Sequence, residues 1–242
     1  GQRFFRFNPG PIFGQLILAD EINRTPPKTQ AALLEAMQEG AITYGGKTYP
    51  LPQTFFVLAT QNPIEQAGTY PLPEAQLDRF LFQLTIGYPT EADELTMLAR
   101  TTGAPPPRIV PVMTSAEVLA LQQLARSLPI SESLLAYINR LVRATRDRAH
   151  PVAGRWIRWG AGPRAGQALV VAAKARAVLA GRLAPTLDDV RALAAPVLRH
   201  RIIRSFEAEA DELSADRIIA DLVAAVPTPS SPLDAVGDQV RT

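Results

Sequence analysis

Two adjacent carboxylates close an apolar segment near the start of the chain. Residues 16–21 read LILADE, so Asp20 and Glu21 directly follow a strand-like run. The carboxyl end of a strand in an α/β sheet opens into the crevice where ligands bind. There Asp20 could hold a magnesium ion and Glu21 could deprotonate a water for attack on a γ-phosphate. An isolated Asp-Glu pair more often ends a strand in solvated acids, so the surrounding residues decide the interpretation.

A neutral amide and an arginine follow later in the chain. The second apolar run, FFVLAT, leads into Gln61 and Asn62, and the Asn62 amide can donate to a phosphate oxygen and accept from a water. The segment YPLPEAQLDRF then places Arg79 just before a third apolar run. Arg79 could pair with Asp78 or Glu74, or reach the phosphates of a neighbouring subunit as an arginine finger.

The elements that must position these side chains alternate between strand and helix. Continuous apolar runs predict three strands buried on both faces: 15–20, 55–62 and 80–86. Thr25, followed by two prolines, predicts a helix N-cap, and residues 31–39 have helical composition ending at Gly40. This rhythm predicts an α/β fold with a parallel sheet.

The second half of the chain has a different pattern, which predicts an all-α bundle. Apolar residues recur every three or four positions after residue 132, as on the buried face of a helix. Helices are expected near 132–149 and 215–225. N-caps are expected at four positions, two of them in capping boxes: Thr114 with Glu117, Thr186 with Asp189, Ser131 and Ser214.

Charge and proline content predict where the two halves meet. Residues 1–102 hold 7 Lys/Arg against 10 Asp/Glu, whereas residues 103–242 hold 18 against 13. The intervening GAPPPRIVPV favours an extended connector because proline fixes φ and lacks an amide donor. We therefore expect an α/β domain at 1–102 and a linker at 103–112. A helical domain at 113–226 and a flexible tail at 227–242 are expected to follow.

Composition excludes several classes of protein. The chain of 242 residues has no cysteine and two histidines, which removes disulfides and thiolate sites and leaves His150 and His200 as structural residues. No apolar stretch reaches the roughly 18 residues of a membrane span. The first residues, GQRFFRFNPG, lack the apolar run of a signal peptide, so a cytoplasmic location is expected.

One apparent nucleotide motif is rejected on its context. AITYGGKT at 41–48 fits a loose phosphate-loop pattern, but a working loop needs a strand before it and a helix after it. Here Pro50 and Pro52 prevent a helix from following. Gly45-Gly46 between β-forming residues instead predicts a hairpin turn.

These segments, in this order, resemble the MoxR family of AAA+ ATPases over roughly residues 10–205. The carrying motifs are LILADE, KTQAALLEAMQEG, FFVLATQNPIEQAGTYPLPEAQLDRF, GRWIRWGAGPRAGQAL and VLRHRI. The resemblance implies an αβα core followed by a helical lid. It also implies a role for each candidate residue: Asp20 as the magnesium ligand of the Walker B strand, Glu21 as catalytic base, Asn62 as sensor 1, Arg79 as arginine finger and Arg164 as sensor 2.

The resemblance also implies cofactors and partners. These are ATP with Mg²⁺, a homo-oligomer in a hexameric ring, and protein clients such as von Willebrand factor A-domain proteins, remodelled or assembled by ATP hydrolysis. No family-type Walker A loop precedes Asp20, so we expect a fragment whose sheet lacks its central strand.

Two alternatives stay open at this point. A non-hydrolysing binding module could dock with AAA+ subunits or clients through its helices. A DNA-stimulated motor is suggested by residues 140–204, with 14 Lys/Arg against 3 Asp/Glu. Aromatic residues that could stack on bases are few there, so nucleic acid is not the expected partner.

Overall fold

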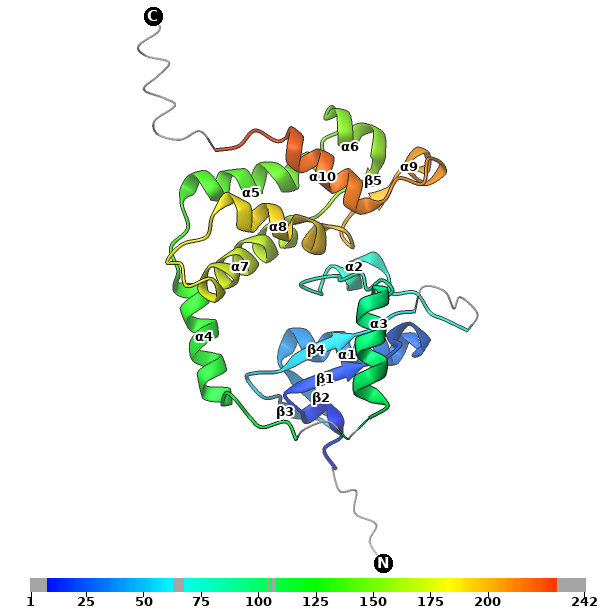
Figure 1. The fold of residues 1–242 in the computed structure, drawn as a ribbon, viewed down its shortest axis with the longest axis vertical. Helices are drawn as coiled ribbons and strands as arrows, with labels where there is room; N and C mark the ends of the chain where they lie inside the picture. The colour runs from blue at the N-terminus through cyan, green and yellow to red at the C-terminus, as the bar shows by residue number, and fades with distance from the viewer. Residues whose placement is uncertain (1–7, 63–67, 104, 106–107, 230–242) are drawn as a thin grey trace, which may run out of the picture.

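The computed structural model describes residues 8–62, 68–103, 105 and 108–229, and it divides into an α/β part and a helical part (Figure 1). The α/β part contains, in chain order, the short 3-10 turns η1 (Pro11–Phe13) and η2 (Ile22–Arg24), the strands β1 (Leu16–Ala19), β2 (Ala41–Tyr44), β3 (Lys47–Pro50) and β4 (Phe56–Ala59), and the helices α1 (Pro27–Glu39), α2 (Glu74–Leu77) and α3 (Glu91–Thr101).

The helical part begins at residue 115. It comprises α4 (Ser115–Ser127), α5 (Glu132–Ala144), α6 (Pro151–Trp156), α7 (Pro163–Leu179), α8 (Leu187–Leu198), α9 (Phe206–Ala210) and α10 (Ala215–Ala225), with two short strands, β5 (Ile157–Trp159) and β6 (Ile203–Arg204). The antiparallel β5–β6 pair is an addition to the all-α expectation. No helix in the described ranges is long and apolar enough to cross a membrane.

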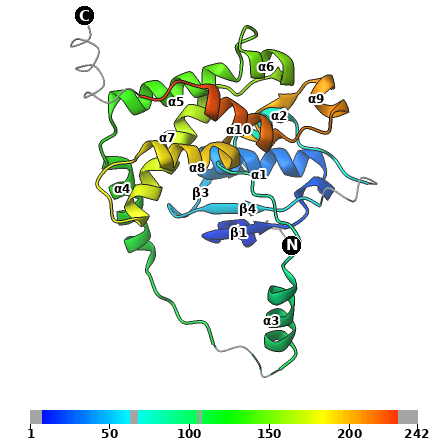
Figure 2. The ribbon, with the colours of Figure 1, turned by 45° about the horizontal axis from the view of Figure 1, so that its top comes forward.

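Strands β1 and β4 pair in parallel, with Leu16 opposite Phe56 and Ala19 opposite Ala59. The connection between them contains α1, which packs along one face of the pair (Figure 2). A small core holds this arrangement, in which buried Leu34 of α1 contacts Ile22 and Leu72. The parallel register brings the carboxyl ends of both strands to the same edge.

The expectation that these strands are buried on both faces was wrong. Leu16 and Leu18 are 65% and 63% exposed, and Phe56 and Leu58 of β4 are also exposed. The reason is that α1 covers one face, whereas nothing in the described part of the chain covers the other.

The expected third strand at 80–86 was also wrong. This segment is irregular, and its backbone bonds to the helical part: Gln83 N donates to Pro196 O at 2.9 Å, and Arg199 Nη1 donates to Gln83 O at 2.9 Å. A strand needs a neighbouring ladder to satisfy its N–H and C=O groups. Here the helical part binds the carbonyls of Phe80, Leu81 and Gln83 and the amide of Gln83, and no strand pairs with this segment in the described part of the chain.

The predicted end of the first helix and the predicted hairpin turn in the α/β part are confirmed, whereas one predicted N-cap was wrong. Helix α1 ends at Gly40 with φ of 60°, and Gly45 and Gly46, with φ of 58° and 75°, form the predicted turn of the β2–β3 hairpin. The Thr25 N-cap was wrong, because its hydroxyl donates to Ile22 O and Pro26 occupies the N-cap position.

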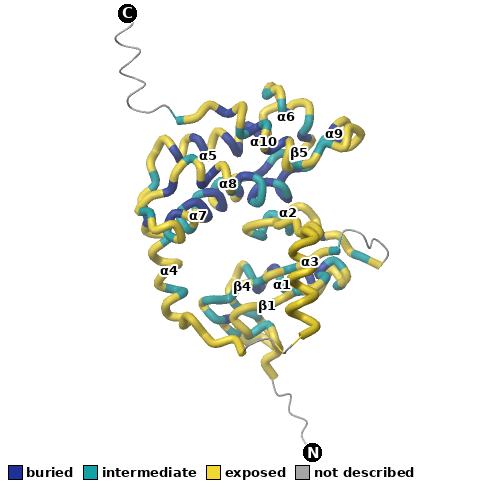
Figure 3. The backbone as a smooth tube through the Cα atoms, in the orientation of Figure 1, coloured by how far each residue is buried: buried dark blue, intermediate teal, exposed yellow. Residues whose placement is uncertain are grey.

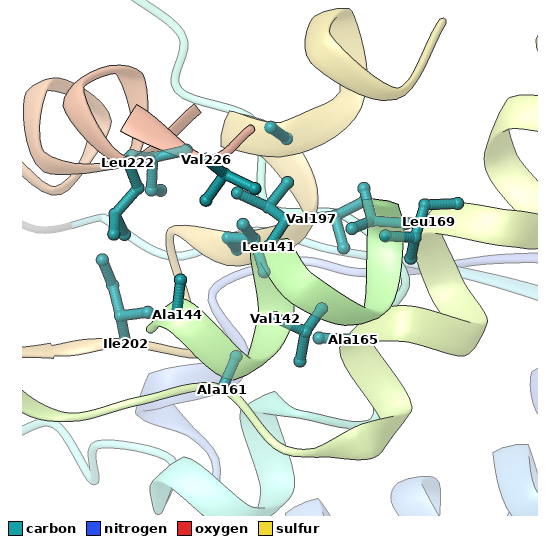
Figure 4. Close-up of a cluster of buried hydrophobic side chains, with 14 of the residues drawn as sticks. Leu141, Val142, Ala144, Ala161, Ala165, Leu169, Val197, Ile202, Leu222 and Val226 are labelled. Atoms are coloured by element: carbon teal, nitrogen blue, oxygen red, sulfur yellow. The ribbon is translucent and has the colours of Figure 1, made fainter. Parts of the chain in front are cut away.

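The helical part contains the larger core (Figures 3 and 4). Helix α5 buries one face, including Leu141 and Val142, against α7 and α10, and residues of α8 belong to the same core cluster. All four predicted caps are confirmed: Thr114 and Thr186 in capping boxes, Ser131 and Ser214 by accepting from backbone amides. The helix expected at 132–149 stops at Ala144, because the chain turns and His150 caps α6 ahead of Pro151.

Candidate functional site

The two carboxylates lie at the carboxyl end of β1, beside the end of β4. Thr60, the residue after β4, donates its hydroxyl to Asp20 Oδ1 at 2.6 Å and accepts from Glu21 N at 2.8 Å. Main-chain bonds join Thr60 to the residues on either side of the acidic pair, since Thr60 N donates to Ala19 O and Ile22 N donates to Thr60 O, both at 3.0 Å. The strand ends are therefore fixed relative to each other by four hydrogen bonds.

Thr60 was missed by the sequence reasoning. The available signal was a hydroxyl at the end of FFVLAT, where the chain leaves an apolar strand. Threonine is common in strands for its β-branched shape, so its type alone does not indicate a role in a site. The parallel register reveals it, because it places Thr60 next to Asp20.

Glu21 has an unusual backbone. Its φ and ψ of 48° and 50° lie in the left-handed region, which costs a non-glycine residue about 1 to 2 kcal/mol. Its side chain is 40% exposed, and Oε2 lies 3.3 Å from Arg24 Nη1. The left-handed conformation of Glu21 turns the backbone away from the extended direction of β1 immediately after Asp20. The two carboxylate residues therefore differ in backbone conformation.

A buried glutamine fixes the loop that follows. Gln30 of α1 is 2% exposed and donates from Nε2 to Ile22 O at 3.1 Å and to Tyr70 O at 2.9 Å. Tyr70 N in turn donates to Asn23 O at 2.6 Å. These bonds connect the residues after Glu21 to the segment leading into α2, another link that the sequence did not indicate.

Asn62 lies near the acidic pair, whereas the rejected phosphate-loop match lies in a separate two-stranded sheet. Asn62 is half-buried and follows Thr60 by two residues, at the sheet edge that carries Asp20. Residues 41–48 form the β2–β3 hairpin.

Asp78, at the end of α2, contacts two arginines of the helical part. Its Oδ1 accepts from Arg201 Nε at 2.8 Å, and its Oδ2 lies 3.6 Å from Arg164 Nη1. Arg164 stands in the first turn of α7 behind Pro163, as predicted. Arg79 therefore does not take Asp78 as its partner, and within the described residues its side chain makes no hydrogen bond or ion pair.

Arg201 is the most deeply buried charged side chain near these groups, at 2% exposure. Burial lowers the pKa of Arg201, and its hydrogen bond with Asp78 opposes that effect. Its neighbour His200 donates from Nε2 to Phe80 O at 3.1 Å. Burial, followed by the charge of Arg201, lowers the pKa of His200 to about 4, so the imidazole is neutral near pH 7.

The donors at the strand ends fit a hard cation. Mg²⁺ commonly takes one or two carboxylates and keeps several waters, and the exposed Asp20 carboxylate with the Thr60 hydroxyl beside it offers that kind of oxygen set. Among the described residues there is no cluster of three or more His, Cys, Asp or Glu that would form an all-protein cage. These residues would therefore suit an ion that keeps most of its waters and could also bind a phosphate oxygen.

Comparisons with known proteins show which family of proteins the chain resembles. Residues 1–82 match the model of the ATPase family associated with various cellular activities (AAA), and residues 152–222 match the AAA lid domain. The chain is 40% identical to the chaperone MoxR1 of Mycobacterium tuberculosis over 95% of its own length and 61% of that protein's. It is 44% identical to YeaC of Bacillus subtilis over 93% and 69% of the two lengths.

A solved structure shows the same fold. The crystal structure of "a putative ATPase" from Cytophaga hutchinsonii superposes with a TM-score of 0.87 at 39% identity, covering 93% of this chain and 69% of that one. The chain thus spans 61 to 69% of the length of these similar proteins. An α/β core with a helical lid is the fold they share.

Proposed function

The chain belongs to the MoxR family of AAA+ ATPases, and on that premise we propose that the groups at the ends of β1 and β4 hydrolyse ATP in the full-length protein. Asp20 would hold the magnesium ion and Glu21 would take a proton from the attacking water. The magnesium supplies neutralisation of charge on the phosphate oxygens. The energy released would drive remodelling or assembly of protein clients.

The observation that carries this proposal is the pairing of Thr60 with both carboxylate residues. Thr60 donates to Asp20 Oδ1 and accepts from Glu21 N, which orients one carboxylate and anchors the backbone of the other. A general base must stand within hydrogen-bond reach of the proton it removes, and the 40% exposed Glu21 side chain is accessible to water.

The remaining candidates have supporting positions. Asn62, at the same edge, would donate to a phosphate oxygen without adding negative charge. Arg164, at the start of α7, would contact the γ-phosphate from the lid, and Arg79 would enter the site of an adjacent subunit in a hexameric ring. Clients with von Willebrand factor A domains are part of the same proposal. The family matches do not favour the non-hydrolysing alternative.

The test is Glu21→Gln in the full-length protein. Loss of the base should lower kcat by roughly 10² to 10⁴-fold while nucleotide binding changes little. Phosphate release and binding of a fluorescent ATP analogue measure the two effects. Glu39→Gln, at an exposed position at the end of α1, is the matched control and should retain wild-type turnover. Unchanged kcat in the Glu21 variant would remove this residue from the mechanism.

A further inference from the structure

The Arg201 guanidinium joins the lid to the segment that carries Arg79. Nε donates to Asp78 Oδ1 at 2.8 Å, Nη2 to Asp78 O and Phe80 O at 3.0 and 2.6 Å, and Nη1 to Leu81 O at 3.2 Å and to Val197 O. A guanidinium has five N–H groups, and each has an acceptor here. Four of these five acceptors belong to residues 78–81, more than a hundred positions away in the sequence.

The acceptors flank Arg79 on both sides. Arg201 binds the carbonyls before and after Arg79, and Arg79 N donates to Gln76 O at 3.1 Å. The backbone of this residue is therefore fixed. Its side chain, half-buried and without a bond in the described structure, remains available for an external partner.

Neighbouring residues extend the contact. His200 Nε2 donates to Phe80 O, and Arg199 Nη1 donates to Gln83 O. Three consecutive lid residues thus bind backbone carbonyls of the core segment 78–83. Only Arg201 combines near-complete burial with an ion pair to that segment, since Arg199 instead pairs with Asp216 of α10.

We propose that Arg201 is a positioning residue for Arg79: the lid, through Arg201, sets where the arginine finger stands. The proposal rests on the function proposed above and adds a residue to it. A displacement of the lid relative to the core would be transmitted to Arg79 through the bonds at Asp78 and Phe80. An interaction with a reacting phosphate is sensitive to misplacement by about 1 Å, so the backbone of an arginine finger requires such support.

Arg201→Lys in the full-length protein is the first variant. Lysine keeps the charge but has three N–H donors on one nitrogen in place of the five on a planar fork, so it cannot reach all five acceptors that Arg201 binds. We expect kcat to fall by about tenfold or more, with a change in the KM for ATP below about twofold. Arg217→Lys, in an exposed Arg217–Asp221 pair on α10, is the control and should leave both constants unchanged.

A double-mutant cycle with Arg79→Ala separates positioning from a general structural role. If Arg201 acts through Arg79, the double variant should be no slower than Arg79→Ala alone. Multiplied losses in the double variant, or an unchanged kcat in Arg201→Lys, would overturn the proposal. Should Arg201→Lys fail to fold, Arg201→Gln takes its place in the same cycle, with the same two outcomes.

The result is distinguishable from failure of the proposed function. Wild-type turnover in Glu21→Gln would contradict the ATPase site itself. A loss of turnover in Glu21→Gln combined with multiplied losses in the Arg201 cycle would contradict the positioning role alone.

Discussion

The Thr60 hydroxyl donates to Asp20 Oδ1 at 2.6 Å, across the parallel pair of β1 and β4. The two residues are forty positions apart in the chain, yet the register of the strands makes them neighbours. The same hydroxyl accepts from Glu21 N, so one side chain supports both carboxylate residues. With Asp20 as the proposed magnesium ligand, Thr60 would support a metal ligand, and such supports affect both affinity and activity.

Thr60→Val tests that support. Valine keeps the β-branched shape but neither donates to Asp20 nor accepts from Glu21 N, so the half-saturating Mg²⁺ concentration for ATP hydrolysis should rise by about tenfold or more. Thr60→Ser keeps the hydroxyl and should restore most of the affinity. A magnesium titration of phosphate release gives the value for each variant. Equal magnesium dependence of the valine and serine variants would contradict this role.

The left-handed backbone of Glu21 predicts a conflict between stability and function. Glycine adopts this conformation without the steric cost, so Glu21→Gly should raise the free energy of unfolding by about 1 kcal/mol while turnover is lost. Denaturant unfolding and phosphate release measure the two quantities.

The chain offers a matched control for this prediction. Glu212 has a φ of 51° and is exposed in the lid, away from the site residues. Glu212→Gly should give a similar stabilisation with unchanged turnover. The prediction would be contradicted if Glu21→Gly lowered the free energy of unfolding while Glu212→Gly raised it. The interactions of the Glu21 side chain would then stabilise the fold by more than its left-handed backbone destabilises it.

Stability should fall as the pH drops from 6.5 to 4. The pKa of His200 is about 4 in the fold against an ordinary value of 6.5, because burial and Arg201 disfavour the imidazolium. Between these pH values the unfolded chain binds more protons than the folded one. The contribution of the neutral imidazole to the free energy of unfolding is up to about 3 kcal/mol. It is fully present above pH 6.5 and is lost as the pH falls to 4. Urea unfolding at a series of pH values measures this slope.

His200→Gln removes the titrating group and should flatten the slope between pH 6.5 and 4. Asp189 does not obscure the result. Its pKa is lowered to about 2, chiefly by the hydrogen bond from Arg182, so its stabilisation is complete above pH 3.8 and lost only below it. An unchanged slope in the His200 variant would assign the acid sensitivity to other groups.

The lid and the core segment illustrate why part of the fold could not be predicted. Residues 80–86 are as apolar as a buried strand, and periodicity alone predicted one. The structure shows that the backbone of this segment bonds instead to Pro196 and Arg199. Strand formation depends on a partner, and a pattern within one segment carries no information about which partner lies beside it.

The sequence by itself determined what depends on neighbours along the chain. The hairpin turn at Gly45-Gly46, the capping boxes at Thr114 and Thr186, and the strand ending before Asp20 and Glu21 need only a few consecutive residues, because turn chemistry, capping and periodicity act over that range.

Only the tertiary structure decided which distant residues meet. It brought Thr60 to Asp20 and Arg201 to Asp78, across separations of 40 and 123 residues. The roles proposed for Asn62, Arg79 and Arg164 depend on the same kind of contact, which a complete ring with bound nucleotide would supply. The physical reason is that hydrogen bonds and ion pairs form wherever chain packing places the partners, and packing depends on the whole core.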